Sequence, residues 1–465
     1  MSLPESKSEA VSVAIEEMPP GQASSDGKRE TFEAIFPGNL PFARLRAWAL
    51  RGGASIVQQG LFAGSHFLMN VLLARWLAPA SYGAFALAYS FFLLALSLYM
   101  ALLYEPLLVY GAGRYKDVFF AYVRVLLGGH FALLLPLSLL FAFAAPLLGH
   151  FYTHELQTAF AWLALVCPFL LLMWLFRAVF YTQLNPYAGT VAGAFYFVLV
   201  PTLVWLFHAL DILSPATALG IMAIASFLVC AGCLYSIRGA GQAANPRPAG
   251  MAARVVSDHW RYGRWAALTA MATWVPANIY YALLPSRYGL EGTATLRAMM
   301  NLMYPLLHSF TALLTLLIPI LVRQRERESL ERSKRTTLQL VAIYVPAGVV
   351  YLLLITSLRA PLLNLLYAGR YNSTSTWMVF CVAMLPITTG VIGLLGSALR
   401  SFERPHLAFI GYLPSTIVAV FVGVPLSLHY GVSGAATALV LSDLSAIAVL
   451  SICFASYKEA KGVAA

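Results

Sequence analysis

Long apolar stretches alternate along the chain with short polar segments, and most of these stretches run for about 20 residues or more. A helix of about 20 apolar residues is long enough to cross the roughly 30 Å hydrocarbon core of a membrane. From residue 52 onward the pattern therefore predicts about 12 transmembrane helices. Their predicted ranges are 52–77, 83–108, 123–149, 157–181, 187–209, 214–236, 265–285, 293–321, 337–358, 374–399, 406–428 and 432–456.

An eight-residue sequence occurs twice, at corresponding places in the two halves of this pattern. It reads APLLGHFY at 145–152 and APLLNLLY at 360–367, so five of the eight positions are identical. Because each half holds six predicted helices, both halves would have the same orientation, with a pseudo-symmetry axis along the membrane normal. The sequence thus predicts an all-α polytopic membrane protein in which two pseudo-symmetric six-helix lobes surround a central cavity.

The predicted helices divide the chain into five parts. Residues 1–44 are mostly polar, with too little apolar surface to fold alone, so we expect a disordered cytoplasmic tail. The first six helices form an N-lobe, 45–236, and the last six form a C-lobe, 265–457. A basic cytoplasmic linker, 237–264, joins the lobes, and a short cytoplasmic C-terminus, 458–465, follows them.

Composition and charge then fix the class of protein and its orientation. Apolar residues make up 60% of the chain and charged residues 11%, which excludes an ordinary soluble protein. In the predicted topology nearly all Lys and Arg lie on the side shared by both termini, so we expect both termini to be cytoplasmic. The formal net charge of +11 is then an orientation signal and predicts no nucleic-acid partner. The exceptions on the opposite side are Arg75, Arg287, Arg297, Arg359 and Arg370.

A motif lies between the first two predicted helices. Residues 72–87 read LLARWLAPASYGAFAL. This segment resembles the pattern of polysaccharide transporters in the multidrug, oligosaccharidyl-lipid and polysaccharide exporter superfamily, which are the O-antigen and exopolysaccharide flippases. Ala78 stands where that family usually has Gly. Together with the helix layout, the resemblance extends over about residues 45–457.

The resemblance implies a function as well as a fold. It implies a bacterial inner-membrane flippase that moves an undecaprenyl-pyrophosphate-linked oligosaccharide outward by alternating access, while the lipid tail stays in the bilayer. The implied partners are this lipid-linked oligosaccharide, membrane lipids and the polysaccharide polymerase or export machinery. The resemblance leaves the sugar repeat open.

Polar residues inside the spans mark two candidate pathway faces. Each such residue costs free energy in hydrocarbon unless it faces protein or water. The first helix carries Gln59, His66 and Asn70 on one face, and the eighth carries Arg297, Asn301, Tyr304 and His308 on one face.

Two such stripes predict a wetted, cationic cleft suited to a pyrophosphate-linked sugar, with Arg75 near its outer end as a clasp for an anionic head group. The alternative is that the stripes hydrogen-bond helices to one another and that Arg75 only snorkels to the membrane surface.

Two carboxylates fall within or near the predicted spans. Glu105 lies near the cytoplasmic end of the second helix, and Asp443 lies in the middle of the twelfth. Each is a candidate to carry a coupling proton or Na⁺, and each is equally compatible with a structural, paired carboxylate.

The sequence contains no pattern that calls for a cofactor, a metal or catalysis. Cys230 and Cys233 form a CxxC inside an apolar helix, without the context of a redox protein, and no P-loop is present. Two rival functions remain open. One is a cation-coupled multidrug or small-molecule exporter of the same superfamily. The other is a membrane glycosyltransferase, polymerase or ligase, against which the short predicted outer loops argue.

Overall fold

The computed structural model describes residues 42–182, 186–241, 249–308, 310, 321, 324–325, 328–402 and 405–457. Nearly all of the predicted N-terminal tail, the predicted C-terminus 458–465 and most of the last third of the predicted eighth helix lie outside these residues. Contacts divide the chain into Met1–Trp48 and Ala49–Ala465, and the description below concerns the second unit.

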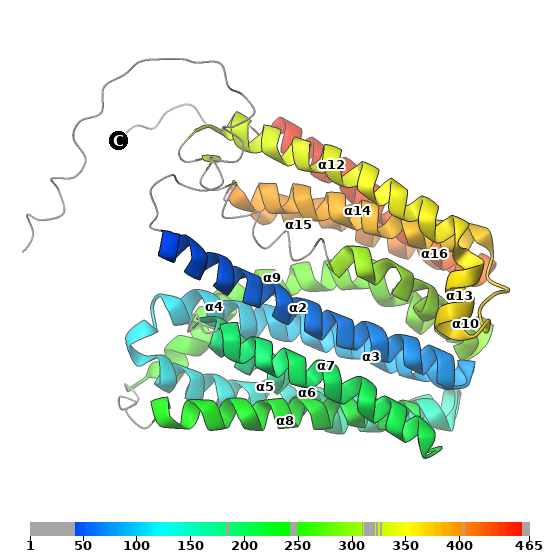
Figure 1. The fold of residues 1–465 in the computed structure, drawn as a ribbon, viewed down its shortest axis with the longest axis horizontal. Coiled ribbons are helices and arrows are strands. Elements are labelled where there is room, and N and C mark those ends of the chain that lie inside the picture. The colour runs from blue at the N-terminus through cyan, green and yellow to red at the C-terminus, as the bar shows by residue number, and fades with distance from the viewer. Residues whose placement is uncertain are drawn as a thin grey trace, which may run out of the picture. The chain divides into compact units, whose positions relative to one another are not determined.

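The described residues are almost entirely helical (Figure 1). The first half contains α2 (Phe42–Trp76), α3 (Pro79–Tyr99), η1 (Met100–Tyr104), α4 (Glu105–Ala112), η2 (Lys116–Val118), α5 (Phe119–Phe151), α6 (His154–Thr182), α7 (Pro186–Ala209) and α8 (Pro215–Gly241). The second half contains α9 (Met251–Leu283), α10 (Pro285–Met300), η3 (Asn301–Met303), α12 (Leu330–Ser357), α13 (Arg359–Tyr367), α14 (Thr376–Ser401), α15 (Pro405–Val418), η4 (Ala419–Gly423) and α16 (Val424–Ser456).

The two halves repeat the same packing. In the first half α5 packs against α6, α6 against α8, and α7 against α8. In the second half α12 packs against α14, α14 against α16, and α15 against α16, which are the same pairs by position in the repeat. Figure 1 shows these two groups of helices with α2, α3, α9 and α10 between them.

Eight helical stretches among the described residues are long and apolar enough to cross a membrane. The longest, Phe409–Ser456, contains the last predicted span, 432–456, and all but the first three residues of the one before it, 406–428. The predicted class, an all-α polytopic membrane protein with two lobes, is confirmed.

The main differences from the prediction concern polar helix ends. The helix predicted from residue 265 begins at Met251, so the second half of the predicted linker belongs to α9. Hydropathy detects only the part of a helix that lies in hydrocarbon, whereas this extension carries Asp258 and His259 and is held by polar contacts described below. The short helix α13 was not predicted, because nine residues are too few to cross a membrane.

Two prolines create hydrogen-bonding sites that neighbouring helices use. A proline has no N–H, so it cannot pair with the carbonyl four residues earlier. Pro106 in α4 stands four residues after Leu102, whose carbonyl oxygen lies 2.8 Å from Nδ1 of His259 in α9. Pro276 stands four residues after Ala272, whose carbonyl accepts a hydrogen bond from Thr416 Oγ1 at 2.6 Å. Side chains from distant helices therefore satisfy polar groups that water cannot reach in a membrane.

Candidate functional site

A cavity of about 240 Å³, which we call the central cavity, is lined mainly by helices of the first half of the chain. Most of its wall comes from α2, α3 and α6, and the second half of the chain contributes Arg297, Tyr304 and His308. The predicted polar stripes of the first and eighth helices meet here. Its lining residues include Gln59, Phe62, His66, Phe67, Asn70, Tyr89, Trp174, Arg177, Arg297, Tyr304 and His308, and none of the described lining residues is an Asp or Glu.

Arg297 is a buried cation in this wall, with 4% of its surface exposed. Its Nε donates to Asn70 Oδ1 at 3.1 Å, and its Nη1 donates to the Tyr304 hydroxyl at 3.1 Å. The guanidinium also lies 4.9 Å from the ring centre of Tyr89. The two stripes are thus joined through Arg297, and its charge is stabilised by neutral oxygens and aromatic faces.

Arg177 is a second buried cation in the same wall, and it was not among the residues predicted to line the pathway. It lies in α6 with its guanidinium between two aromatic rings, 4.2 Å from the centre of Phe62 and 4.3 Å from that of Trp174. Its Nη2 donates to Gln59 Oε1 at 3.3 Å. Its Nε and Nη1 are buried and have no hydrogen-bond partner among the residues that the structure describes.

The signal that identifies Arg177 in the sequence is its apolar flank. In the predicted topology Arg177 lies near the cytoplasmic end of the fourth helix, 157–181, where a positive charge is expected. The residues after it, Ala178, Val179, Phe180 and Tyr181, continue α6 for a further apolar turn, which places the arginine within the apolar part of the helix.

The cavity therefore has uncompensated positive charge. No ion pair between described residues involves Arg177 or Arg297. An arginine stays protonated in a protein, and a buried charge without a counterion is costly. Charges in a low-dielectric wall also interact far more strongly than charges in water. The arrangement favours an anion in the cavity, with the free donors of Arg177 available to it.

Two histidines complete the wall. The Nδ1 atom of His66 is buried without a partner, and its ring centre lies 5.7 Å from that of Tyr196. His308 stacks on Tyr304 with ring centres 5.4 Å apart. Both rings line the same cavity as the two arginines.

Arg75 and Asn301, which were predicted to line the same pathway, do not line this cavity. Arg75 Nη1 donates to the carbonyl of Leu365 in α13 at 2.8 Å. Asn301 is buried, and its Nδ2 lies 3.2 Å from the hydroxyl of Tyr82 and 3.5 Å from that of Tyr367. Both residues instead connect the two halves of the chain. Arg75 of the first half donates to Leu365 of the second, and Asn301 of the second half donates to Tyr82 of the first.

These contacts belong to what we call the outer lobe contact, formed where the α2–α3 turn meets α10 and α13, at the end predicted to face outside. Gly83 of α3 packs so closely on α10 that a Cβ there would lie 1.9 Å from the carbonyl oxygen of Leu290. Arg370 Nη1 donates to the carbonyl of Leu77, reciprocating the bond from Arg75 to Leu365. The segment 72–87, which resembles the polysaccharide-transporter pattern, thus lies where the two lobes meet.

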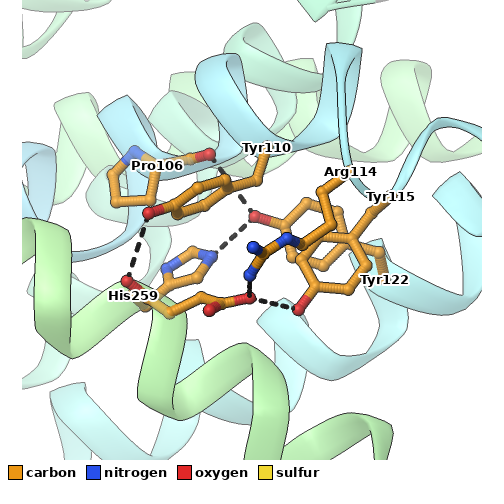
Figure 2. A network of polar contacts seen from close by, with 7 residues as sticks. Pro106, Tyr110, Arg114, Tyr115, Tyr122 and His259 are labelled. Carbon is orange, nitrogen blue, oxygen red and sulfur yellow. Dashed lines mark hydrogen bonds and ion pairs between the residues drawn. The ribbon is translucent and has the colours of Figure 1, made fainter.

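A second network connects α9 to the N-lobe at the opposite end (Figure 2). Arg114 Nη1 forms an ion pair with Asp258 Oδ2 at 2.6 Å, and the Tyr115 hydroxyl donates to the same oxygen at 2.7 Å. The Tyr122 hydroxyl lies 2.6 Å from His259 Nε2. Burial raises the pKa of Asp258, but the hydrogen bonds from Arg114 and Tyr115 outweigh it and hold the pKa below its usual range.

The two candidate coupling carboxylates lie apart from the cavity. Asp443 Oδ2 accepts hydrogen bonds from the hydroxyls of Thr388 at 2.5 Å and Thr389 at 3.1 Å. Glu105 is exposed at the start of α4, with its Oε2 3.4 Å from the Tyr262 hydroxyl. Among the described residues, no group of three or more His, Cys, Asp or Glu is arranged to hold a metal ion, and all five cysteines are free.

Comparison with known proteins gives a likeness in structure only. No family model matches the chain, and no curated protein matches its sequence. A multidrug-resistance MATE family transporter of the MOP superfamily, in an inward-facing conformation, matches with a TM-score of 0.71 and 11% identity over 86% of this chain and 97% of that one. The lipid II flippase MurJ, in an inward closed conformation, matches with a TM-score of 0.66 and 16% identity over 88% of each chain.

The chain has the fold of the MOP-superfamily transporters. A further match is a MOP-superfamily transporter from Pyrococcus furiosus, with a TM-score of 0.62 and 12% identity over 87% of this chain and 94% of that one. That protein is described as having a binding pocket of reverse polarity that suggests a different function. Likeness of fold therefore does not determine what the cavity of this chain binds.

Proposed function

We propose that this protein is a flippase for an undecaprenyl-pyrophosphate-linked oligosaccharide destined for a surface polysaccharide such as O-antigen or exopolysaccharide. The observation that carries the proposal is the pair of buried arginines, Arg177 and Arg297, in one cavity whose described lining contains no carboxylate. A pyrophosphate has the charge and the multiple acceptor oxygens that guanidinium donors bind best. The protein would act in the bacterial inner membrane, with both termini cytoplasmic and with a polysaccharide polymerase or export machinery as partner.

Alternating access would move the head group past the two arginines. The cavity, at about 240 Å³, is smaller than the roughly 300–1,000 Å³ of typical ligand pockets, so it would have to widen to admit a sugar beyond the pyrophosphate. The outer lobe contact would stay closed during loading and open for release, while the lipid tail remained in the bilayer. Asn70 and Tyr304, which share Arg297, would return to it when the anion leaves.

A cation-coupled drug exporter is the rival transport function, because a multidrug-resistance MATE transporter is among the proteins of similar structure. A cationic drug would need an acidic or neutral cavity, whereas no described Asp or Glu lines this one. Asp443, with its two threonine hydroxyls, is the better candidate for a coupling ion in either function because it is half-buried within a membrane span, and Glu105 is the second.

Reconstitution tests the proposal directly. Proteoliposomes would carry a fluorescent undecaprenyl-pyrophosphate disaccharide, and a membrane-impermeant reductant would bleach only the outer leaflet. The protein should raise the bleached fraction from about half towards completion. Arg177→Gln and Arg297→Gln each remove a charge-assisted interaction of about 1.5–3 kcal/mol and should weaken the apparent affinity by about 10- to 150-fold.

Arg124→Gln is the matched control, because Arg124 is exposed on α5 away from the cavity and loses the same charge. A protein that leaves the lipid unbleached but exports ethidium from cells would refute the flippase and support the drug exporter. Equal activity in the cavity variants and the Arg124 control would remove the arginine pair from the mechanism. Joining of sugars by the purified protein would instead indicate a glycosyltransferase or ligase.

A further inference from the structure

A second cavity, of about 500 Å³, lies in the C-lobe at the predicted outer end. It shares no lining residue with the central cavity. Its wall comes from the start of α10, the turn between α13 and α14, and the first part of α16, with Pro79 from the N-lobe at one edge. Its polar and aromatic lining residues are Tyr288, Glu291, Thr295, Arg370, Tyr371, Ser373, Thr374, Ser375, Tyr430 and Ser433.

Two breaks in the helices shape this cavity. Gly289 has φ of 66° and Gly431 has φ of 60°, a region that L side chains rarely adopt. The break at Gly431 exposes backbone carbonyls, and the Tyr288 hydroxyl donates to two of them, those of Leu428 at 3.1 Å and His429 at 3.0 Å. The Tyr288 ring also packs against Gly431, where a Cβ would lie 3.0 Å from Cε1. The ring is therefore fixed in the wall.

The remaining wall combines hydroxyls with one carboxylate and one guanidinium. The hydroxyls of Ser375 and Ser433 lie 3.1 Å apart across the junction of two segments. No hydrogen bond or ion pair between described residues uses the Glu291 carboxylate, so its oxygens remain available as acceptors. The Tyr430 ring, 70% exposed, stands at the cavity as a free aromatic face.

A pyranose matches this set of groups. Its faces present C–H groups that pack on an aromatic ring, and its edge presents hydroxyls that both donate and accept hydrogen bonds. Glu291 accepts from such hydroxyls, while serine and threonine hydroxyls serve either role. A bare phosphate fits less well, because Glu291 would repel it and offset the attraction of Arg370.

We propose that this C-lobe cavity is a saccharide-binding site, separate from the central cavity. The source of its ligand rests on the proposed function, since a flippase for lipid-linked oligosaccharide delivers sugar to this side. Arg370 also donates to the Leu77 carbonyl of the N-lobe, so a bound saccharide lies beside the outer lobe contact.

Photocrosslinking in cells that make the native polysaccharide tests the site whatever the identity of the sugar. Tyr430→p-benzoylphenylalanine places the crosslinker at the C-lobe cavity. Tyr152→p-benzoylphenylalanine is the matched control, since Tyr152 is also an exposed tyrosine, 40% exposed, and follows α5 at the predicted outer end of the N-lobe. After irradiation, the purified protein is oxidised with periodate and labelled with a fluorescent hydrazide, which reports attached carbohydrate.

We expect a carbohydrate adduct at position 430 that exceeds the one at 152 by about tenfold or more, and that falls several-fold when Glu291→Gln is added. No adduct at 430, or equal adducts at 430 and 152, would overturn the C-lobe site. A third crosslinker, Phe67→p-benzoylphenylalanine, lies in the central cavity and reports on the proposed function separately. An adduct at 67 without one at 430 leaves the flippase standing and overturns this inference, whereas the reverse supports the site and contradicts the proposed route.

Discussion

Replacing Gly83 with alanine should force the two lobes apart at the outer lobe contact. Gly83 lies within α3 and has ordinary helical geometry, so alanine fits its backbone and the effect is purely steric. The added Cβ would lie 1.9 Å from the carbonyl oxygen of Leu290 and 2.6 Å from its carbonyl carbon. Because both atoms belong to the backbone of α10, no side-chain rotation relieves the clash.

The size of the effect follows from that geometry. Nonbonded heavy atoms are most stable at about 3.5–4.0 Å, so α3 and α10 must separate by about 1.5 Å or more. Overpacking of this kind costs about 1–3 kcal/mol in the closed arrangement. A difference of that size shifts a two-state equilibrium by about 5- to 150-fold towards the open arrangement.

Double electron–electron resonance between two spin labels can measure this shift towards the open arrangement. Labels at positions 152 and 430 lie on the predicted outer ends of the two lobes, in a background without the five free cysteines. Gly83→Ala should increase the population at longer distances. Gly128→Ala is the matched control, because a Cβ at Gly128 meets nothing within 4 Å and the residue is exposed in α5. Identical distance distributions in the two variants would refute the reasoning.

Three further variants test other parts of the structure. Arg177→Lys should retain part of the flippase activity that Arg177→Gln loses, because it keeps the charge but not the planar fork; equal loss in both would show that geometry alone matters. Asp258→Asn removes the partner of Arg114. Since the folded pKa of Asp258 is lowered, its stabilisation is present above the unfolded pKa of about 3.9 and is lost as pH falls through the folded value. The Tm of the unmodified protein should therefore fall more steeply between about pH 5 and 3 than that of Asp258→Asn, and parallel curves would contradict this. Asp443→Asn should abolish any dependence of transport on a proton or Na⁺ gradient, measured in proteoliposomes, and an unchanged dependence would exclude Asp443 as the coupling group.

Much of the fold could be predicted because local hydropathy controls it. Apolar runs long enough to cross a membrane have to be helical, since backbone polar groups in hydrocarbon must be paired within the segment. The repeated octapeptide shows where this reasoning stops. Its first copy remains part of α5, whereas its second copy forms the separate helix α13, whose carbonyl at Leu365 accepts a hydrogen bond from Arg75. Two similar local sequences thus form different structures. The second copy contacts Arg75, which lies 290 residues from Leu365 in the chain, and local sequence does not reveal such a contact.

The candidate site, like the fold, could be predicted only in part from the sequence. The helical spacing predicted that Gln59, His66 and Asn70 share one helix face, and all three line the central cavity. Arg75 was expected to clasp a head group or snorkel, but its donor contacts the opposite lobe. Arg177 was counted with the Lys and Arg of the cytoplasmic side, whereas the structure places its guanidinium against the rings of Phe62 and Trp174 in the cavity wall.

Arg75 and Arg177 show how the protein separates cationic donors that connect its lobes from donors that remain available to a ligand. At the outer lobe contact, each arginine donates to a backbone carbonyl, a neutral acceptor that forms no ion pair and can be released at modest cost. In the central cavity, Arg177 keeps Nε and Nη1 without partners. Leaving buried donors unpaired costs about 1–3 kcal/mol each, so an anion that satisfies them gains that free energy on binding. The unpaired donors therefore favour an occupied cavity, and the weakly held outer contact allows the lobes to part once it is filled.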